Sequence, residues 1–599
     1  MAHPKPMEHQ LKGLEYTRKE FENAAYKISK AMGYMSSLNK QAFRYQFEQG
    51  QEDLDYANEL AGVGLFLDMG VGKTWLGRRV AQDLHKWMKS WDINAELKGR
   101  ANQPVLIVCP NNGKSVWDEQ WPLWSEEGDD DVLWVVDTQV STQYMKYLKR
   151  GLVKYVCMSY DTLLARWNEF KDIEWSLVIL DEVQATSNNT AARTQCAYQI
   201  KALFRIAMSG TPSPNSMEQL YHVLTWVRGY TKGIYSWDGT LIRWQRDSKT
   251  WGDMAGFMSM YGDGRNLTHE KADLRACWVH RSRGYDPDHM DNCMALYERM
   301  KRNGCMRVLA KDVLDLPPLK FVQVPLELTK SQELAYNMLL RGVMGWVHDG
   351  RQYGLRGYIN VGSVISQITY AMECCTDLRQ LGYSIAAKEM KNDISGSIVD
   401  YGGMVSDMFS SLKPGEASSK LEWLENFLSS MTDKVLVFTD FEKTASLLAQ
   451  DLKDYGVVLY TGKERALLKG NEYNKVEMAE AIRVAQNDDS YRVIIGTKSL
   501  YESVTLTAAN RVVLYGKVDY APGKVFNAIR RVWRCGQTKP VTVYNLWSPG
   551  TAEVWLNKKI EKKQAMFDAA YDNDKVDLHS NFAITSSQDI IDIFKGVTR

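Results

Sequence analysis

The chain has 599 residues, of which 45% are hydrophobic and 25% charged, a composition typical of a globular protein with several domains. Its 74 basic and 73 acidic residues leave a net charge of +1, which excludes a broadly basic surface and restricts any nucleic acid to a local basic cleft. The nine cysteines form no C-x-x-C pair, which argues against a zinc site or a disulfide framework.

Short, continuous apolar runs recur along the chain with helical stretches between them. Such runs are typical of strands buried on both faces of a parallel sheet. The first set is Gly64–Leu67, Val105–Cys109, Val132–Val136, Tyr155–Met158, Leu177–Leu180 and Arg205–Met208. The second set is Val435–Phe438, Val457–Tyr460, Val493–Ile495, Val512–Leu514 and Val541–Tyr544. The two sets predict an α/β protein with two doubly wound parallel-sheet lobes.

Between the two sets the sequence is rich in Met, Arg, Tyr and Trp and has helical periodicity, which predicts helical insertions. We expect an N-terminal lobe at 1–228, a mainly helical insertion with the lobe junction at 229–320, a helical protrusion of the second lobe at 321–410, the C-terminal lobe at 411–560 and a polar tail at 561–599.

A phosphate-binding loop follows the first apolar run. Gly64–Asp68 leads directly into Met69-Gly70-Val71-Gly72-Lys73-Thr74, and a helix is expected from Trp75. The glycines allow backbone N–H groups to surround phosphate oxygens, Lys73 can reach the β and γ phosphates, and Thr74 can bind Mg²⁺. A glycine turn with a chance Lys-Thr is the alternative, which the strand–loop–helix context disfavours.

An acidic pair follows the run Leu177–Leu180. Asp181 is placed to hold Mg²⁺, directly or through water, and Glu182 to orient and deprotonate the attacking water. A solvated acidic turn is the alternative, but the phosphate-binding loop favours hydrolysis.

Several segments resemble motifs of superfamily-2 helicases. Asp181-Glu182-Val183-Gln184 resembles the D-E-x-H/Q box, and Ser209-Gly210-Thr211-Pro212 resembles the S/T-G-T-P motif. Asn527–Gln537, N-A-I-R-R-V-W-R-C-G-Q, closely resembles the last motif of the Swi/Snf-like DNA translocases. Smaller matches follow in family order at Val105–Pro110 with Trp117, Lys311–Pro318, Ser419–Leu421 and Thr505–Ala509.

The resemblance implies two RecA-like lobes that use ATP and Mg²⁺. It implies that Gln10 reads adenine, and that Gln184, Ser209, Gly210, Thr211 and Gln537 couple hydrolysis to movement. It also implies that Arg531 and Arg534 of the second lobe stabilise the charge on the γ-phosphate when the lobes close, a task for which guanidinium groups are suited. A solvated basic helix is the alternative for the two arginines.

The resemblance further implies translocation of a monomer along double-stranded DNA, with a DNA-bound protein as a further partner. Contacts to the phosphate backbone position such a motor without reading sequence. The candidates for these contacts, each of which could also be an ordinary surface residue, are Lys114, Ser115, Ser159, Tyr160, Thr439, Lys498 and Thr505.

Departures from the family pattern, such as Leu500–Val504 in place of a glycine-rich stretch and Gly516 in place of an aspartate, suggest a divergent viral or microbial branch. Without a signal peptide or an apolar run of about 18 residues, we expect a cytoplasmic protein, associated with the nucleoid or encoded by a virus, with no membrane partner. Two alternatives stay open: a helicase that separates DNA or RNA strands, and a nucleotide-gated switch that binds another protein.

Overall fold

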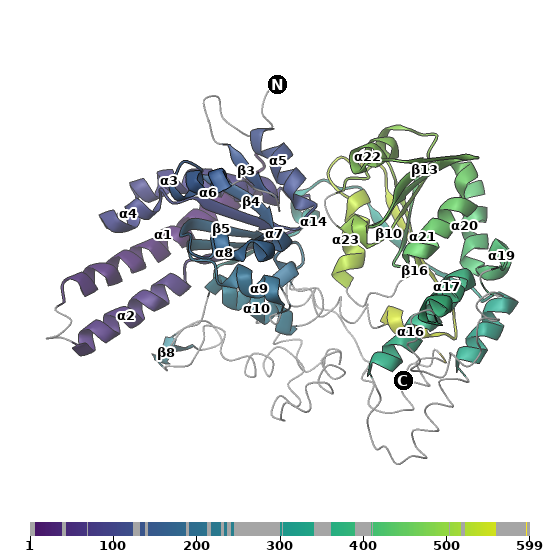
Figure 1. The fold of residues 1–599 in the computed structure, drawn as a ribbon, viewed down its shortest axis with the longest axis horizontal. Helices are drawn as coiled ribbons and strands as arrows, with labels where there is room; N and C mark the ends of the chain where they lie inside the picture. Colours follow the sequence, from purple (N-terminus) through teal and green to yellow (C-terminus); the bar gives the residue numbers. More distant parts are fainter. Residues whose placement is uncertain are drawn as a thin grey trace, which may run out of the picture. The chain divides into compact units, whose positions relative to one another are not determined.

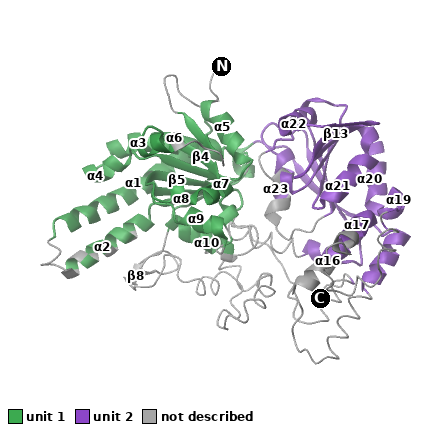
Figure 2. Ribbon diagram, in the orientation of Figure 1, with its two compact units in different colours: residues 1–268, 285–314, 565–577 green, residues 269–284, 315–564, 578–599 purple. Residues whose placement is uncertain are grey.

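The computed structural model describes residues 6–38, 44–68, 70–123, 132–137, 142–186, 188, 191–212, 217–228, 233–235, 241–244, 297, 300–301, 303–340, 361–389, 409, 411–501, 504–516, 522–558 and 595 (Figure 1). They form two compact units (Figure 2). The described residues up to 314 belong to the first unit, and those from 315 onward belong to the second. The boundary therefore falls inside the predicted junction segment 229–320.

The first unit is built on a seven-stranded sheet in the order β3-β4-β2-β5-β6-β1-β9. All of its strand pairs are parallel. Six of the strands confirm the predicted runs, and the seventh, β9, comes from the segment predicted as mainly helical. The strands are β1 Gly62–Leu67, β2 Val105–Cys109, β3 Leu133–Val136, β4 Tyr155–Ser159, β5 Trp175–Asp181, β6 Ala202–Met208 and β9 Cys305–Val308.

Helices pack around this sheet because its central strands are apolar on both faces. The long helices α1 and α2, which were not predicted, lie side by side as a hairpin (Figure 1). The helices are α1 Glu8–Ser36, α2 Arg44–Glu59, α3 Lys73–Ser90, α4 Ala95–Arg100, α5 Gly113–Leu123, α6 Thr142–Lys149, α7 Tyr160–Ala165, α8 Trp167–Phe170, the 3₁₀ turn η1 Val183–Thr186, α9 Ala192–Tyr198, α10 Met217–Arg228 and α14 Ala310–Val313. A small antiparallel pair joins β7 Gly233–Tyr235 to β8 Leu241–Trp244.

The second unit contains an eight-stranded sheet in the order β10-β17-β16-β11-β15-β12-β13-β14. The strand pairs are parallel except for two, β12 with β13 and β13 with β14, which are antiparallel. Five strands confirm the second set of apolar runs, whereas β10, β13 and β14 were not predicted. The strands are β10 Leu319–Pro325, β11 Val435–Thr439, β12 Val457–Tyr460, β13 Arg465–Lys469, β14 Glu472–Lys475, β15 Val493–Gly496, β16 Arg511–Gly516 and β17 Val541–Trp547.

The segment predicted as a helical protrusion, 321–410, contributes to the body of the second unit. β10 pairs with β17, and Cys374, Cys375 and Leu378 are fully buried in one apolar cluster with Trp555. The helices of this unit are α16 Val361–Thr376, α17 Leu378–Glu389, α19 Pro414–Ala417, α20 Ser419–Ser429, α21 Glu442–Asp451, η5 Lys453–Tyr455, α22 Met478–Asn487, η6 Lys498–Tyr501 and α23 Pro522–Val532. Residues 330–340 and 552–558 are also helical.

Candidate nucleotide-binding and hydrolysis site

The phosphate-binding loop leaves the end of β1 and enters α3, as predicted. Gly70 has φ 80° and Gly72 has φ 87°, and Gly72 precedes the first residue of the 18-residue helix. Both values lie in the left-handed region that favours glycine. A β-carbon on Gly72 would also lie 1.9 Å from Nε2 of Gln10. The loop therefore needs its glycines for conformation and for space. Met69 lies outside the described residues.

Lys73 turns back over the loop from the first turn of α3. Its Nζ donates to the carbonyl of Leu67 at 3.1 Å and lies 3.9 Å from Oε1 of Glu182. The side chain of Lys73 is 10% exposed, so the charge is held in a shielded place. An ammonium group at a helix N-terminus beside inward-facing N–H groups is suited to a nucleotide phosphate.

Gln10 lies against the phosphate-binding loop. Its Oε1 accepts from the N–H of Met7 at 2.8 Å, and its Nε2 lies 3.4 Å from the carbonyl of Val71. Nε2 of the neighbouring His9 lies 2.9 Å from the same carbonyl. The first turn of α1 thus supports the loop, a role for both side chains that was not predicted. Adenine recognition by Gln10 stays a prediction.

Asp181 ends β5 and is held by three hydrogen bonds. Its Oδ2 accepts from Nε1 of Trp117 at 2.9 Å, and its Oδ1 accepts from the N–H of Glu182 at 3.0 Å. The hydroxyl of Tyr160 donates to its carbonyl at 2.9 Å. Burial, with a further contribution from the charge of Glu182, raises the pKa of Asp181 to about 6, although Lys73 and Trp117 oppose the rise.

Glu182 has the one positive φ among the described non-glycine residues, 49°. A left-handed backbone at such a position costs about 1–3 kcal/mol and is common at functional sites. Its Oε2 accepts from Nε2 of Gln184 at 2.7 Å, and Oε1 faces Lys73. The strained backbone directs the carboxylate toward the phosphate-binding loop, where it can orient a water molecule.

A chain of hydrogen bonds links Glu182 to the end of β6. The hydroxyl of Ser209 donates to Oε1 of Gln184 at 2.6 Å and accepts from the N–H of Thr211 at 2.9 Å. Gly210 lies between these two residues and is buried. The structure therefore brings together the four first-lobe residues predicted to couple hydrolysis to movement, Gln184, Ser209, Gly210 and Thr211.

The donors predicted for Mg²⁺ are the hydroxyl of Thr74 and the carboxylate of Asp181. Both oxygens of Asp181 already accept hydrogen bonds from the protein, which favours contact through a water molecule. Within the described ranges no cluster of three His, Cys, Asp or Glu could bind a metal ion. This sparse donor set fits Mg²⁺, which keeps waters and takes ligands from substrate phosphates.

Of the predicted arginines, Arg531 lies in the last turn of α23 and Arg534 follows this helix in the second lobe. Arg531 is 4% exposed, and its carbonyl accepts from the N–H of Leu506 at 2.8 Å. Nη1 of Arg534 lies 3.5 Å from the carbonyl of Val504, and burial lowers the pKa of Arg534. The structure thus shows partly desolvated arginines instead of a solvated basic helix.

The side chain of Gln537 lies among three backbone carbonyls of the second lobe. Its Nε2 lies 3.0, 2.7 and 3.3 Å from the carbonyls of Thr507, Ala509 and Val532, and its Oε1 accepts from the N–H of Lys539. The side chain is 6% exposed. These bonds connect the end of α23 to the loop before β16, whereas the predicted coupling role stays a prediction.

Three of the predicted DNA contacts have buried side chains. Ser159, Tyr160 and Thr439 are 1%, 3% and 0% exposed, which disfavours a contact between these side chains and a phosphate backbone. Ser159 caps α7, Tyr160 supports Asp181, and the hydroxyl of Thr439 accepts from the N–H of Phe441.

The other four DNA candidates keep some exposure. Lys114 forms an ion pair with Asp137 and is 19% exposed, and Ser115 and Lys498 are exposed. Thr505 is half-buried. Their DNA contacts stay predictions.

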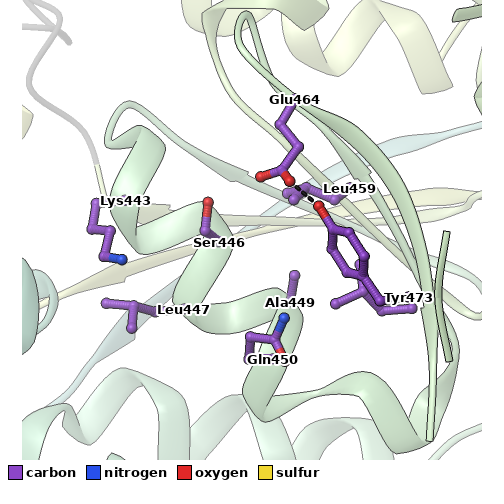
Figure 3. A pocket seen from close by; sticks show the side chains of 9 residues that line it. Lys443, Ser446, Leu447, Ala449, Gln450, Leu459, Glu464 and Tyr473 are labelled. Atoms are coloured by element: carbon purple, nitrogen blue, oxygen red, sulfur yellow. Dashed lines mark hydrogen bonds between the residues drawn. The ribbon is translucent and has the colours of Figure 1, made fainter. Parts of the chain in front are cut away.

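A separate cavity of about 310 Å³ lies in the second lobe between α21 and the β13–β14 hairpin (Figure 3). Its lining includes Leu447, Leu459 and Leu468, and the carboxylate of Glu464, which also lines it, accepts from the hydroxyl of Tyr473.

A phosphate-binding loop, an acidic pair after another strand of the same sheet and a second parallel-sheet lobe with buried arginines define a two-lobe P-loop nucleotide-binding protein. The SNF2-related domain model matches residues 9–380, and the helicase conserved C-terminal domain model matches residues 419–536. The chain therefore belongs to the SNF2-related family.

Curated relatives agree with this assignment. The chain is 22% identical to "DNA repair and recombination protein RAD54B" of Gallus gallus over 82% of its length, and 21% identical to the protein of that name from Homo sapiens over 90%. It spans about half the length of these relatives, 50% and 55% respectively. It is also 23% identical to "DNA excision repair protein ERCC-6-like 2" of Mus musculus, over 88% of this chain and 35% of that one.

Among solved structures, the "Sulfolobus solfataricus SWI2/SNF2 ATPase core in complex with dsDNA" is 17% identical to this chain, with a TM-score of 0.34. The match covers 99% of this chain and 97% of that one.

Of the described helices, none is both long and apolar enough to cross a membrane.

Proposed function

We propose that this chain is a DNA-dependent ATPase that couples ATP hydrolysis to translocation along double-stranded DNA and so remodels DNA or DNA–protein complexes. The observation that carries the hydrolytic part is the contact series from Lys73 through Glu182 and Gln184 to Ser209. It links a phosphate-binding ammonium group, a water-activating carboxylate and the predicted coupling segment in one network.

The side chains divide the work of hydrolysis. Lys73 and the N–H groups of the loop bind and orient the phosphates, and Glu182 accepts the proton of the attacking water. Asp181 and Thr74 would hold Mg²⁺, which when bound neutralises developing charge on the phosphates. Arg531 and Arg534 are assigned to the transition-state charge by their motif. Gln10 is assigned to adenine in the same way.

The DNA part of the proposal is supported by the family and by the names of the relatives, which include DNA repair and recombination proteins. Lys114, Ser115, Lys498 and Thr505 stay as the proposed contacts. We propose that the protein acts as a monomer and that proteins bound on the DNA are further partners.

Steady-state ATPase rates against five conditions test the function: no polymer, single-stranded DNA, duplex DNA, branched DNA and RNA. We expect the highest rate with duplex DNA. Equal rates with RNA or without polymer would refute DNA dependence. Displacement of a triplex-forming strand measures translocation, and displacement of one duplex strand would instead favour a strand-separating helicase.

A further inference from the structure

Arg307 lies in β9, the strand added to the sheet beside the phosphate-loop strand. β9 runs parallel to β1, with Arg307 opposite Phe66 and Val308 opposite Leu67. The side chain of Arg307 is 11% exposed. Because β1 leads directly into the phosphate-binding loop, the guanidinium group is held at the base of that loop.

The guanidinium group joins the ends of three neighbouring strands. Its Nη1 donates to the carbonyl of Phe66 at 3.2 Å and to that of Gly210 at 3.0 Å. Its Nη2 lies 3.1 Å from Oδ1 of Asp68. Phe66 belongs to β1 and Gly210 follows β6, which pairs with the other side of β1. The planar guanidinium fork fixes its donors in one geometry, whereas the three donors of a lysine ammonium group rotate about one nitrogen on a flexible stem.

Asp68, the partner of Arg307, directly precedes the phosphate-binding loop and is 3% exposed. Its Oδ2 accepts from the N–H of Ala310 at 3.1 Å, and its own N–H donates to the carbonyl of Val308 at 2.9 Å. The buried carboxylate therefore connects the loop to β9 and to the first residue of α14. A buried ion pair of this kind is weak evidence for added stability, but it defines one arrangement of its neighbours.

The chain leaves the first unit directly after these contacts. α14 ends at Val313, the boundary between the units falls after Leu314, and β10 of the second unit begins at Leu319. Displacement of this connecting segment would thus act first on β9 and α14. On the far side, Gly210 lies next to Ser209, whose hydroxyl reaches the carboxylate of Glu182 through Gln184.

We propose that Arg307, paired with Asp68, is a positioning residue that ties the phosphate-binding loop and the Ser209–Thr211 segment to the strand by which the chain leaves the first lobe. In a protein that hydrolyses ATP as proposed above, this tie transmits movement of the connecting segment to the nucleotide site. Arg307 acts through the loop and the segment, and is not itself a catalytic residue.

The test compares Arg307→Lys with a matched control, Arg205→Lys. Arg205 lies in the same sheet at the opposite end of β1, opposite Gly62, and also donates to two backbone carbonyls, those of Asn58 and Glu59. Both variants replace an arginine of this sheet whose guanidinium group donates to two backbone carbonyls. A merely structural role predicts equal effects on melting temperature and no separate effect on the nucleotide site.

Two measurements on the full chain separate the variants. Hydrogen exchange, which reports local opening, should rise in Arg307→Lys at 66–74 and 207–212 together, and in Arg205→Lys near 58–62 instead. Affinity for a fluorescent ATP analogue with Mg²⁺, and the ratio of duplex-stimulated to basal ATPase rate, should fall on the order of tenfold in Arg307→Lys and less than twofold in the control.

Unchanged exchange at both segments in Arg307→Lys, with affinity and stimulation within about twofold of the control, would overturn the proposal. If Arg307→Lys does not fold, Asp68→Asn carries the same expectations. In a variant that carries both Arg307→Lys and Asp68→Asn, the losses of affinity and of DNA stimulation should be smaller than the sum of the two single losses, because the two side chains form one unit. If the unmodified chain shows no DNA stimulation, the proposed function fails, whereas exchange and analogue binding still decide the role of Arg307.

Discussion

The ammonium nitrogen of Lys73 lies 3.9 Å from a carboxylate oxygen of Glu182, although the two residues follow different strands of the sheet. A positive charge that binds phosphate and a negative charge that activates water thus lie side by side. The arrangement places both groups at the same end of the first-lobe sheet, where ligands of open α/β sheets bind.

Replacing Glu182 with Gln removes the base and keeps a side chain of the same shape that can still accept a hydrogen bond from Gln184, although it loses the charge contact with Lys73. We expect the ATPase rate to fall at least about 100-fold, because general-base catalysis contributes about 10² to 10⁴. Affinity for ATP with Mg²⁺ should persist. Glu174→Gln, an exposed carboxylate just before the same strand, is the control and should keep full activity. If the Glu182→Gln variant hydrolysed ATP at the rate of the unmodified protein, another group would have to activate the water.

Ser209→Ala should uncouple DNA binding from hydrolysis. The hydroxyl of Ser209 bonds both Gln184 and the N–H of Thr211, so its loss disconnects Glu182 from the end of β6. We expect the basal ATPase rate to change little while stimulation by duplex DNA falls roughly tenfold. Ser176→Ala removes another buried hydroxyl, bonded to the carbonyl of Pro104, and should leave the stimulation intact. Equal losses in both variants would contradict the coupling role.

Asp181 predicts a pH dependence that can be measured without nucleotide. Its pKa in the folded protein, about 6, lies above the ordinary value of 3.8, so the ionised form disfavours the folded state. This effect on the free energy of unfolding is absent below about pH 4 and grows as the pH rises to 6. Above pH 6 it lowers the free energy of unfolding by roughly 3 kcal/mol. Asp181→Asn removes the charge but sets an NH2 group against one of the two N–H donors, a loss that does not depend on pH. In the presence of a chelator, the melting temperature of the variant relative to the unmodified protein should therefore be higher at pH 8 than at pH 4.

The same pKa affects the metal requirement of the unmodified protein. Protons compete with Mg²⁺ for the carboxylate, so the Mg²⁺ concentration needed for half-maximal ATPase rate should rise as pH falls below about 6. A requirement that is constant between pH 5 and 8 would mean that Asp181 does not take part in binding the metal.

The second lobe contains a buried ion pair in which Nζ of Lys420 lies 2.5 Å from Oε1 of Glu553. Lys420 is 0% exposed, and Glu553 also accepts from the N–H of Ser548. Lys420→Met leaves the carboxylate buried without its partner and should destabilise this lobe by about 3–5 kcal/mol.

Removing the charge of Glu553 as well should recover much of the stability lost in Lys420→Met. Chemical denaturation of Lys420→Met and of the double variant with Glu553→Gln measures this. A double variant no more stable than Lys420→Met would show that packing, and not the unpaired charge, causes the loss.

The sequence alone was enough to predict the parts of the nucleotide site that are formed by residues adjacent along the chain. The loop Met69–Thr74 is visible because left-handed glycines, a lysine and a hydroxyl must follow one another between a strand and a helix. Asp181 and Glu182 are visible because they come directly after a buried apolar run. The order of the motifs then indicated the family and the two parallel-sheet lobes.

Tertiary structure alone decided which side chains are exposed and which distant segments meet. Ser159, Tyr160 and Thr439 were predicted to contact DNA, yet they are buried, because exposure depends on the packing of helices over the sheet. β9 joins the phosphate-loop strand from about 240 residues further along the chain, and only that pairing brings Arg307 to Asp68. Such contacts leave no local periodicity, so a single sequence does not reveal them.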